Sequence, residues 1–99
     1  MTSTFRINVP DRFKLATRPN GIVAREAVLQ ALEQYDLVEL DFAGADPTPS
    51  FADECLGVLC KTMGWQSFRQ RVKVRNLTES SRSLFKLVIS RRRSEVAAH

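Results

Sequence analysis

The segment Val38–Gly57 constrains the fold more than any other part of the chain, because a strand pattern passes directly into a helix pattern. Apolar residues at 38, 40 and 42 alternate with acidic ones, which is typical of a strand with one buried face. Gly44 and the run Pro47–Pro49 end that strand, and Ser50 is predicted to cap the helix that follows. Such a junction presents backbone N–H groups and a few side chains at one sheet edge, so we expect a site here.

Strand and helix patterns alternate along the rest of the chain. The expected strands cover residues 4–9, 13–15, 37–42 and 71–77, and the expected helices cover 22–35, 51–63 and 78–93. The strand at Phe13 and Leu15 is short and is expected at an edge, and Trp65–Arg71 is expected to be a loop. Gly57 inside the second helix predicts a close approach of that helix to the sheet. Strands that alternate with helices pair in parallel through right-handed crossovers, so the sequence predicts an α/β fold.

Length and composition predict a single domain over residues 1–99, with a disordered tail at 94–99. The net charge is +4, and no apolar run approaches the ~18 residues of a membrane span. The N-terminus lacks the features of a secretory signal, so we expect a cytoplasmic protein that binds no membrane. Cys55 and Cys60, the two cysteines, diverge by about 140° on one helix and are expected to be reduced core residues.

Basic residues gather in the last third of the chain. Four of them recur at alternate positions and are expected to project from one side of the last strand: Arg69, Arg71, Lys73 and Arg75. With Trp65 and Phe68 nearby, this set predicts a phosphate-and-stacking surface for nucleic acid. The alternative interpretation is a solvated sheet face whose basic side chains discourage aggregation through the edge. An acidic protein partner would suit the same charge.

Two segments carry a family resemblance: Leu40–Gly44, with the sequence LDFAG, and Ser50–Glu54, with the sequence SFADE. Thr17–Arg18 before the first long helix and Val72–Asn76 before the last one support it. In this order they resemble the STAS-like bacterial domain family of unknown function. That family is related to the STAS domains of anti-sigma factor antagonists. The resemblance extends over roughly Phe5–Arg92.

The resemblance implies a four- to five-stranded mixed sheet with helices packed mainly on one face, and a regulatory protein-interaction module. In the antagonist branch, a GHKL-type kinase binds the domain and phosphorylates a serine at the start of the helix after the central strand. Alignment on Leu56–Gly57 puts Glu54 at that phosphoacceptor position. One interpretation is that Asp53 and Glu54 supply permanent negative charge there. The other is that Ser50 or Thr48 is phosphorylated instead.

The expected partner-binding residues are Thr48, Ser50, Phe51, Asp53 and Glu54. A GHKL-type ATPase is the partner that the resemblance implies, and nucleic-acid binding through the last strand and C-terminal helix is the alternative. We expect no enzyme activity, metal or cofactor. Adjacent carboxylates on a helix diverge by about 100°, and Ser50 has no base because the single histidine, His99, lies at the terminus. We expect a bacterial or phage protein that is a monomer or weak homodimer.

Overall fold

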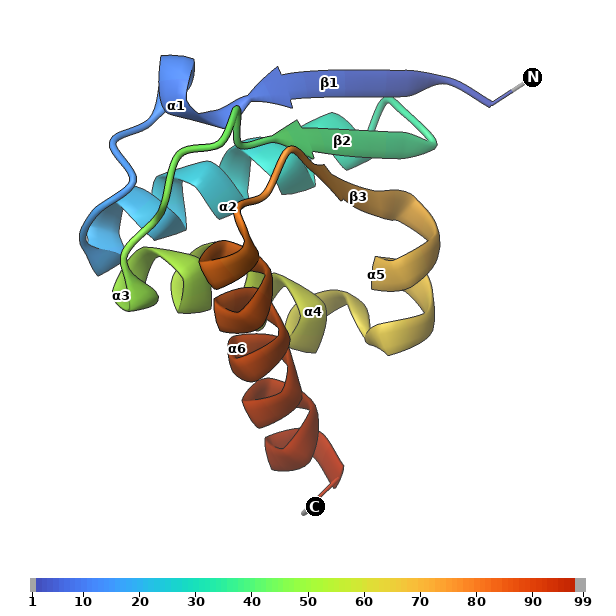
Figure 1. Ribbon diagram of the computed structural model, residues 1–99. Helices are drawn as coiled ribbons and strands as arrows, with labels where there is room; N and C mark the ends of the chain where they lie inside the picture. Colours follow the sequence, from blue (N-terminus) through green and yellow to red (C-terminus); the bar gives the residue numbers. More distant parts are fainter. Residues whose placement is uncertain (1, 98–99) are drawn as a thin grey trace.

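A three-stranded parallel sheet forms the upper layer of the computed structural model, which describes residues 2–97 (Figure 1). In sheet order, the strands are β1 (Thr4–Asn8), β2 (Leu37–Asp41) and β3 (Val72–Arg75). Val38 in the central strand pairs with Phe5 on one side and with Val72 on the other. Because the sheet order follows the chain order, both crossovers run in the same direction and place their helices on one face.

The long helices fill the space below the sheet (Figure 1). The helical elements are α1 (Val9–Arg12), α2 (Arg18–Leu32), α3 (Pro49–Ala52), the π-helical turn η1 (Asp53–Gly57), α4 (Val58–Met63), α5 (Trp65–Arg71) and α6 (Glu79–Ala97). The elements α3, η1 and α4 follow one another without a break and form the central helical segment, residues 49–63. Its middle part, η1, contacts both α2 and α6.

Three helices begin with a polar cap residue and a proline in the first turn. Asn8, Thr17 and Thr48 each accept a hydrogen bond from the backbone N–H three residues further on. Proline suits the first turn because its missing N–H would have no partner there. The prediction that Ser50 caps the central helical segment is therefore wrong, since Thr48 occupies the cap position and Pro49 follows it.

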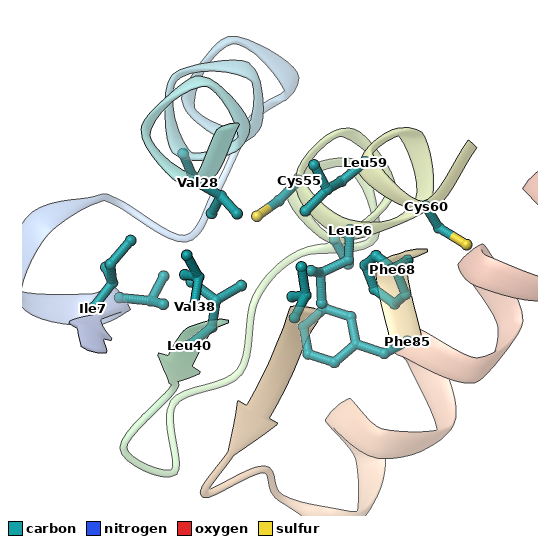
Figure 2. Packing of buried hydrophobic residues seen from close by; sticks show 14 of the residues in the cluster. Ile7, Val28, Val38, Leu40, Cys55, Leu56, Leu59, Cys60, Phe68 and Phe85 are labelled. Carbon is teal, nitrogen blue, oxygen red and sulfur yellow. The ribbon is translucent and has the colours of Figure 1, made fainter. Parts of the chain in front are cut away.

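Side chains from β2 and from the helices below it form the hydrophobic core (Figure 2). Val38 and Leu40 extend from β2 into this core, where they meet the central helical segment at Leu56. Cys55 and Cys60 are free and buried, as predicted. Burial raises the pKa of the Cys55 thiol to about 12, so this thiol stays protonated at neutral pH.

The strand count differs from the expectation. Within residues 2–97 the sheet has three strands that all pair in parallel, so four to five strands in a mixed sheet are not confirmed. The short strand expected at Phe13 and Leu15 does not form. Asn8 caps the one-turn helix α1, and the N–H of Phe13 closes that helix on Val9 O at 2.9 Å. The chain therefore turns away from the sheet before it can pair.

Two helices extend further than expected. Gly64, at φ 84°, ends α4 as predicted, but α5 begins at the next residue, so the loop expected over Trp65–Arg71 is a helix. Thr78 caps α6, because its hydroxyl accepts a hydrogen bond from the N–H of Ser81 at 3.1 Å. Helix α6 continues to Ala97, so the disordered tail is not confirmed for residues 94–97, and residues 98–99 lie outside the described residues.

The upper face of the sheet carries charged side chains. Glu39 on β2 pairs with Arg6 on β1 at 2.7 Å and lies 3.5 Å from Arg75 on β3. This face is therefore polar, whereas the lower face is apolar. Among residues 2–97, no helix combines the length and the apolar composition that crossing a membrane requires.

Candidate functional site

The loop between β2 and α3 is tied down at both ends. The N–H of Phe42 donates to Arg75 O at 3.0 Å, and the N–H of Thr48 donates to Leu15 O at 2.8 Å. Asp41, at the end of β2, accepts hydrogen bonds from Asn76 Nδ2 at 2.9 Å and from the N–H of Ala43 at 2.8 Å. These bonds lower the pKa of Asp41, with Asn76 as the main cause. These hydrogen bonds therefore fix the position of the loop and of the start of α3.

The predicted partner-binding residues differ in exposure. Thr48 is exposed, although its hydroxyl is engaged in capping α3, and Ser50 is half-buried. Phe51 is fully buried in the core. Its predicted role as a surface contact is therefore wrong, because an aromatic side chain in the first turn of this helix points inward under the sheet.

Asp53 and Glu54 are held by three arginines. Arg92 on α6 grips Asp53 with two hydrogen bonds, from Nε at 2.9 Å and from Nη2 at 2.7 Å. Arg18, at the start of α2, lies 3.0 Å from an oxygen of each acid. Arg25, two turns further along α2, lies 3.0 Å from Glu54 and also donates to its backbone carbonyl. We call these five residues the acid–arginine cluster.

The cluster keeps both acids charged. Each acidic side chain is only 17% exposed. Hydrogen bonds from Arg92 and then Arg18 lower the pKa of Asp53 despite its partial burial. Burial acts to raise the pKa of Glu54, but hydrogen bonds from Arg25 and Arg18 lower it overall. The two acids therefore act as ionised anchors for α2 and α6, and most of their charge is compensated within the protein.

Two glycines allow the helices to approach the cluster. A Cβ on Gly57 would lie 2.7 Å from Asp53 Oδ1 and 3.3 Å from Val88 O on α6. A Cβ on Gly21 of α2 would lie 2.8 Å from Glu54 Cβ. Gly57 was predicted to mark a close approach of its helix to the sheet, but the close neighbour is another helix. Both glycines therefore serve helix–helix contact at η1.

Asp53 and Glu54 lie at the start of the π-helical turn and face different helices. The N–H of Val58 donates to Asp53 O, five residues back, which defines the widened turn. Asp53 pairs with Arg92 of α6, and Glu54 pairs with Arg25 of α2, as adjacent helical residues point in different directions. Single π turns inside α-helices frequently occur at functional sites. Within residues 2–97, no three acidic, histidine or cysteine side chains gather as a metal-binding group.

A groove lies beside the cluster, between α3 and α6. Its volume is about 280 Å³, and Ser50 and Asp53 line it on the side of the central helical segment. Leu87 and Arg91 line it on the side of α6, and Arg18 of α2 also lines it. We call this hollow the α3–α6 groove. Ser50 and Asp53 are thus predicted site residues that border an open hollow, whereas Phe51 is buried.

The predicted basic set is not one stripe. Arg69 and Arg71 belong to α5, and only Lys73 and Arg75 lie on β3. Arg71 turns inward and donates to the carbonyls of Leu32, Tyr35 and Asp36 at 2.8, 2.9 and 3.0 Å. It thereby caps the C-terminal end of α2. A projection of all four side chains from one side of the last strand is therefore wrong.

The two aromatics beside that set are also engaged within the fold. Phe68 is buried at 5% exposure, and Trp65 stacks against it at 6.3 Å between ring centroids. The guanidinium of Arg93 lies 4.1 Å from the centroid of the Trp65 ring. Phe68 is therefore part of the hydrophobic core. Trp65 is half-buried beneath an arginine.

The sequence analysis missed the arginines that hold the acids. Arg18 and Arg25 are seven residues apart, so they lie on the same face of α2, two turns from each other. That spacing was a usable signal for a common target. Arg92 offered no such signal, because it lies 39 residues from Asp53 in the chain and within a run of three arginines.

The fold and the site define a small α/β domain with a three-stranded parallel sheet and a fixed helix start after its central strand. Residues 20–82 match the model of the family described as STAS-like domain of unknown function. The chain belongs to this family, as the resemblance predicted, although the match covers less than Phe5–Arg92. A search of curated proteins found no match, and a search of solved structures found none either.

Proposed function

We propose that this STAS-like domain is a non-catalytic, regulatory protein-interaction module. Its contact surface is the loop and helix start around Thr48 and Ser50, together with the neighbouring rim of the α3–α6 groove. The observation that carries the proposal is the rigid mounting of this helix start, which α2 and α6 clamp through the acid–arginine cluster. Binding residues on a fixed scaffold lose little conformational freedom when a partner docks.

The clamp revises the part that the two acids play in the proposal. In one interpretation of the sequence, Asp53 and Glu54 supply permanent negative charge at the helix N-terminus. Because both are paired with arginines and mostly covered, we propose that they position the surface and that Thr48 and Ser50 touch the partner. A GHKL-type ATPase is the partner class that family resemblance suggests. Bacterial or phage origin and a location in the cytoplasm belong to the same proposal.

Site-specific photo-crosslinking in native-host cells tests the proposal. A photoreactive benzoylphenylalanine replaces Ser50 in one version of the protein and Glu26, an exposed residue of α2, in the control version. The expected result is a discrete crosslinked species from position 50 that position 26 does not give, with the partner identified by mass spectrometry. No species from position 50, or the same species from both positions, would contradict the proposal.

Phosphorylation of Ser50 or Thr48 stays a separate prediction. The position that matches the phosphoserine of the antagonist branch holds Glu54, whose carboxylate is paired with Arg18 and Arg25. We therefore propose partner binding without a phosphorylation switch. The intact mass of protein purified from its native host decides this point, because one added phosphate on Ser50 or Thr48 would refute the absence of a switch.

A further inference from the structure

The α3–α6 groove is lined by apolar and by basic side chains. Leu84 and Leu87 of α6 and Pro49 of α3 supply the apolar surface. Leu87 is 47% exposed, which makes it one of two large apolar side chains that residues 2–95 leave open to solvent. The other, Val23 on α2, does not line the groove. An exposed leucine at the edge of a hollow is a typical anchor point for an apolar side chain of a partner.

Positive charge exceeds negative charge around the groove. Its two carboxylates are already paired: Asp53 with Arg92 and Arg18, and Glu95 with Lys61 and Arg92. Hydrogen bonds from these partners lower the pKa of both acids, so both stay ionised and bound to the protein's own cations.

Two arginines at the rim retain donors for a partner. Arg91 is exposed and forms no ion pair with any residue from 2 to 97. The side chain of Arg18 is 51% exposed, although it contacts Asp53 and Glu54. A guanidinium has five N–H donors, so Arg18 keeps free donors at the groove. The rim therefore favours a carboxylate-bearing partner.

We infer that the α3–α6 groove binds an acidic segment of a partner protein, with a leucine-like side chain against Leu87 and flanking carboxylates on Arg18 and Arg91. This inference rests on the proposed function and names the chemistry of the partner. The apolar surface favours a protein segment over nucleic acid as the occupant, because a phosphate backbone would bind the arginines and make no use of Leu87. Charge complementarity with Arg18 and Arg91, together with the apolar surface around Leu87, favours an acidic segment that carries an apolar side chain.

Fluorescence anisotropy with defined peptide probes tests the inference. The main probe is a fluorescein-labelled peptide rich in glutamate and leucine. Two matched probes replace its glutamates with glutamine or its leucines with serine. We expect saturable binding of the main probe and roughly tenfold weaker binding of each matched probe, because each lacks one of the two recognition elements.

Paired variants locate the binding site. Arg91→Glu and Leu87→Ser are expected to weaken binding of the main probe by roughly tenfold each. The controls are Arg82→Glu, an exposed arginine of α6 outside the groove, and Val23→Ser. Both controls are expected to bind as the unchanged protein does. Equal binding by all variants, or no binding of the main probe, would overturn the inference.

Two further measurements separate the possible failures. Duplex DNA that binds in an Arg91-dependent and Leu87-independent way, while the main probe does not bind, would overturn the inference in favour of a polyanion site. Photo-crosslinking from position 50 is repeated in the Leu87→Ser and Arg91→Glu proteins. If the crosslinked species persists in both, the groove inference fails while the proposed function stands. If the protein that carries only the photoreactive residue at position 50 gives no crosslinked species, the proposed function itself fails.

Discussion

Asp53 and Glu54 are neighbours in the chain, but they bind different helices. Asp53 holds Arg92 of α6, and Glu54 holds Arg25 of α2, while Arg18 touches both acids. Each pair is partly covered, so solvent screens it less than an exposed surface pair. At the scale of single residues, the two acids thus join η1 to α2 and α6, and their main effect is expected on stability.

Asp53→Asn is expected to lower the free energy of unfolding by about 1–3 kcal/mol, because it removes the closer and more buried of the two counter-ions of the partly covered Arg92 guanidinium. Glu95→Gln is the matched control on the same arginine. Its pair is 46% exposed on the glutamate side, so little change is expected. Urea denaturation followed by circular dichroism measures both. Equal losses in the two variants would contradict the special role of Asp53.

At the scale of elements, Gly21→Ala tests how closely α2 packs on the central helical segment. Alanine inside a helix normally stabilises by about 0.5–1 kcal/mol relative to glycine. Here the added Cβ would lie 2.9 Å from the backbone oxygen of Phe51 and 2.8 Å from Glu54 Cβ. We therefore expect a net loss of about 1–3 kcal/mol, as in overpacked cores.

Glu26→Ala on the exposed face of α2 is the control for Gly21→Ala, since it introduces alanine into the same helix without a close neighbour from another element. Thermal unfolding of both variants gives the comparison. A melting temperature that rises on Gly21→Ala would show that helix propensity outweighs the contact, and the close approach at η1 would then be of little consequence.

The second prediction about elements concerns the end of α2. Arg71→Lys is expected to lower the free energy of unfolding by about 1–2 kcal/mol, because an ammonium group cannot replace a planar fork that reaches three carbonyls. Arg69→Lys, an exposed residue of the same helix, keeps the charge count equal and is expected to be neutral. Chemical denaturation distinguishes the two, and identical midpoints would refute the capping role of Arg71.

Local patterns predicted the central part of the fold, and contacts between distant residues account for what they did not predict. The alternation at 38, 40 and 42 and the Pro-rich turn identified β2 and the helix start. The sequence held a signal for the cap at Thr48, because a proline such as Pro49 is common at the first helical position. The carbonyls that accept hydrogen bonds from Arg71 lie 35 to 39 residues before it in the chain. The two arginines that bind Asp53 lie 35 and 39 residues from it. Alternate spacing alone therefore placed Arg71 on a strand face.

At the scale of the whole molecule, the upper face of the sheet and the surface of α6 differ in their balance of charge. The upper sheet face mixes Arg6 and Arg75 with Glu39, so neither sign dominates there. The surplus of the +4 chain is therefore more apparent along α6, where Arg82, Lys86 and Arg91 are exposed. Any nucleic-acid binding would then depend on α6 more than on β3. A gel-shift titration across salt tests this alternative. Replacing Lys73 and Arg75 with glutamate is expected to leave the nucleic-acid affinity unchanged.

Stability in acid tests the hydrogen-bonded and ion-paired carboxylates together. Five carboxyl groups have a pKa below the ordinary value in the folded protein, mainly through hydrogen bonds: Asp41, Asp46, Asp53, Glu54 and Glu95. The unfolded chain therefore binds more protons than the folded protein as pH falls. Their contribution to stability is present above the unfolded values near 3.8 and 4.5 and is lost as pH drops through the lower folded values.

We therefore expect the free energy of unfolding to be nearly constant from about pH 7 to pH 5 and to fall steadily towards about pH 3. Urea titrations at a series of pH values measure this dependence. Asp53→Asn removes one of the five groups, so its curve should start lower at neutral pH and descend less steeply, and the two curves should converge in acid. Parallel curves for the two proteins would mean that Asp53 has the same pKa in the folded and unfolded states, and the acid–arginine cluster would then contribute nothing through this carboxylate.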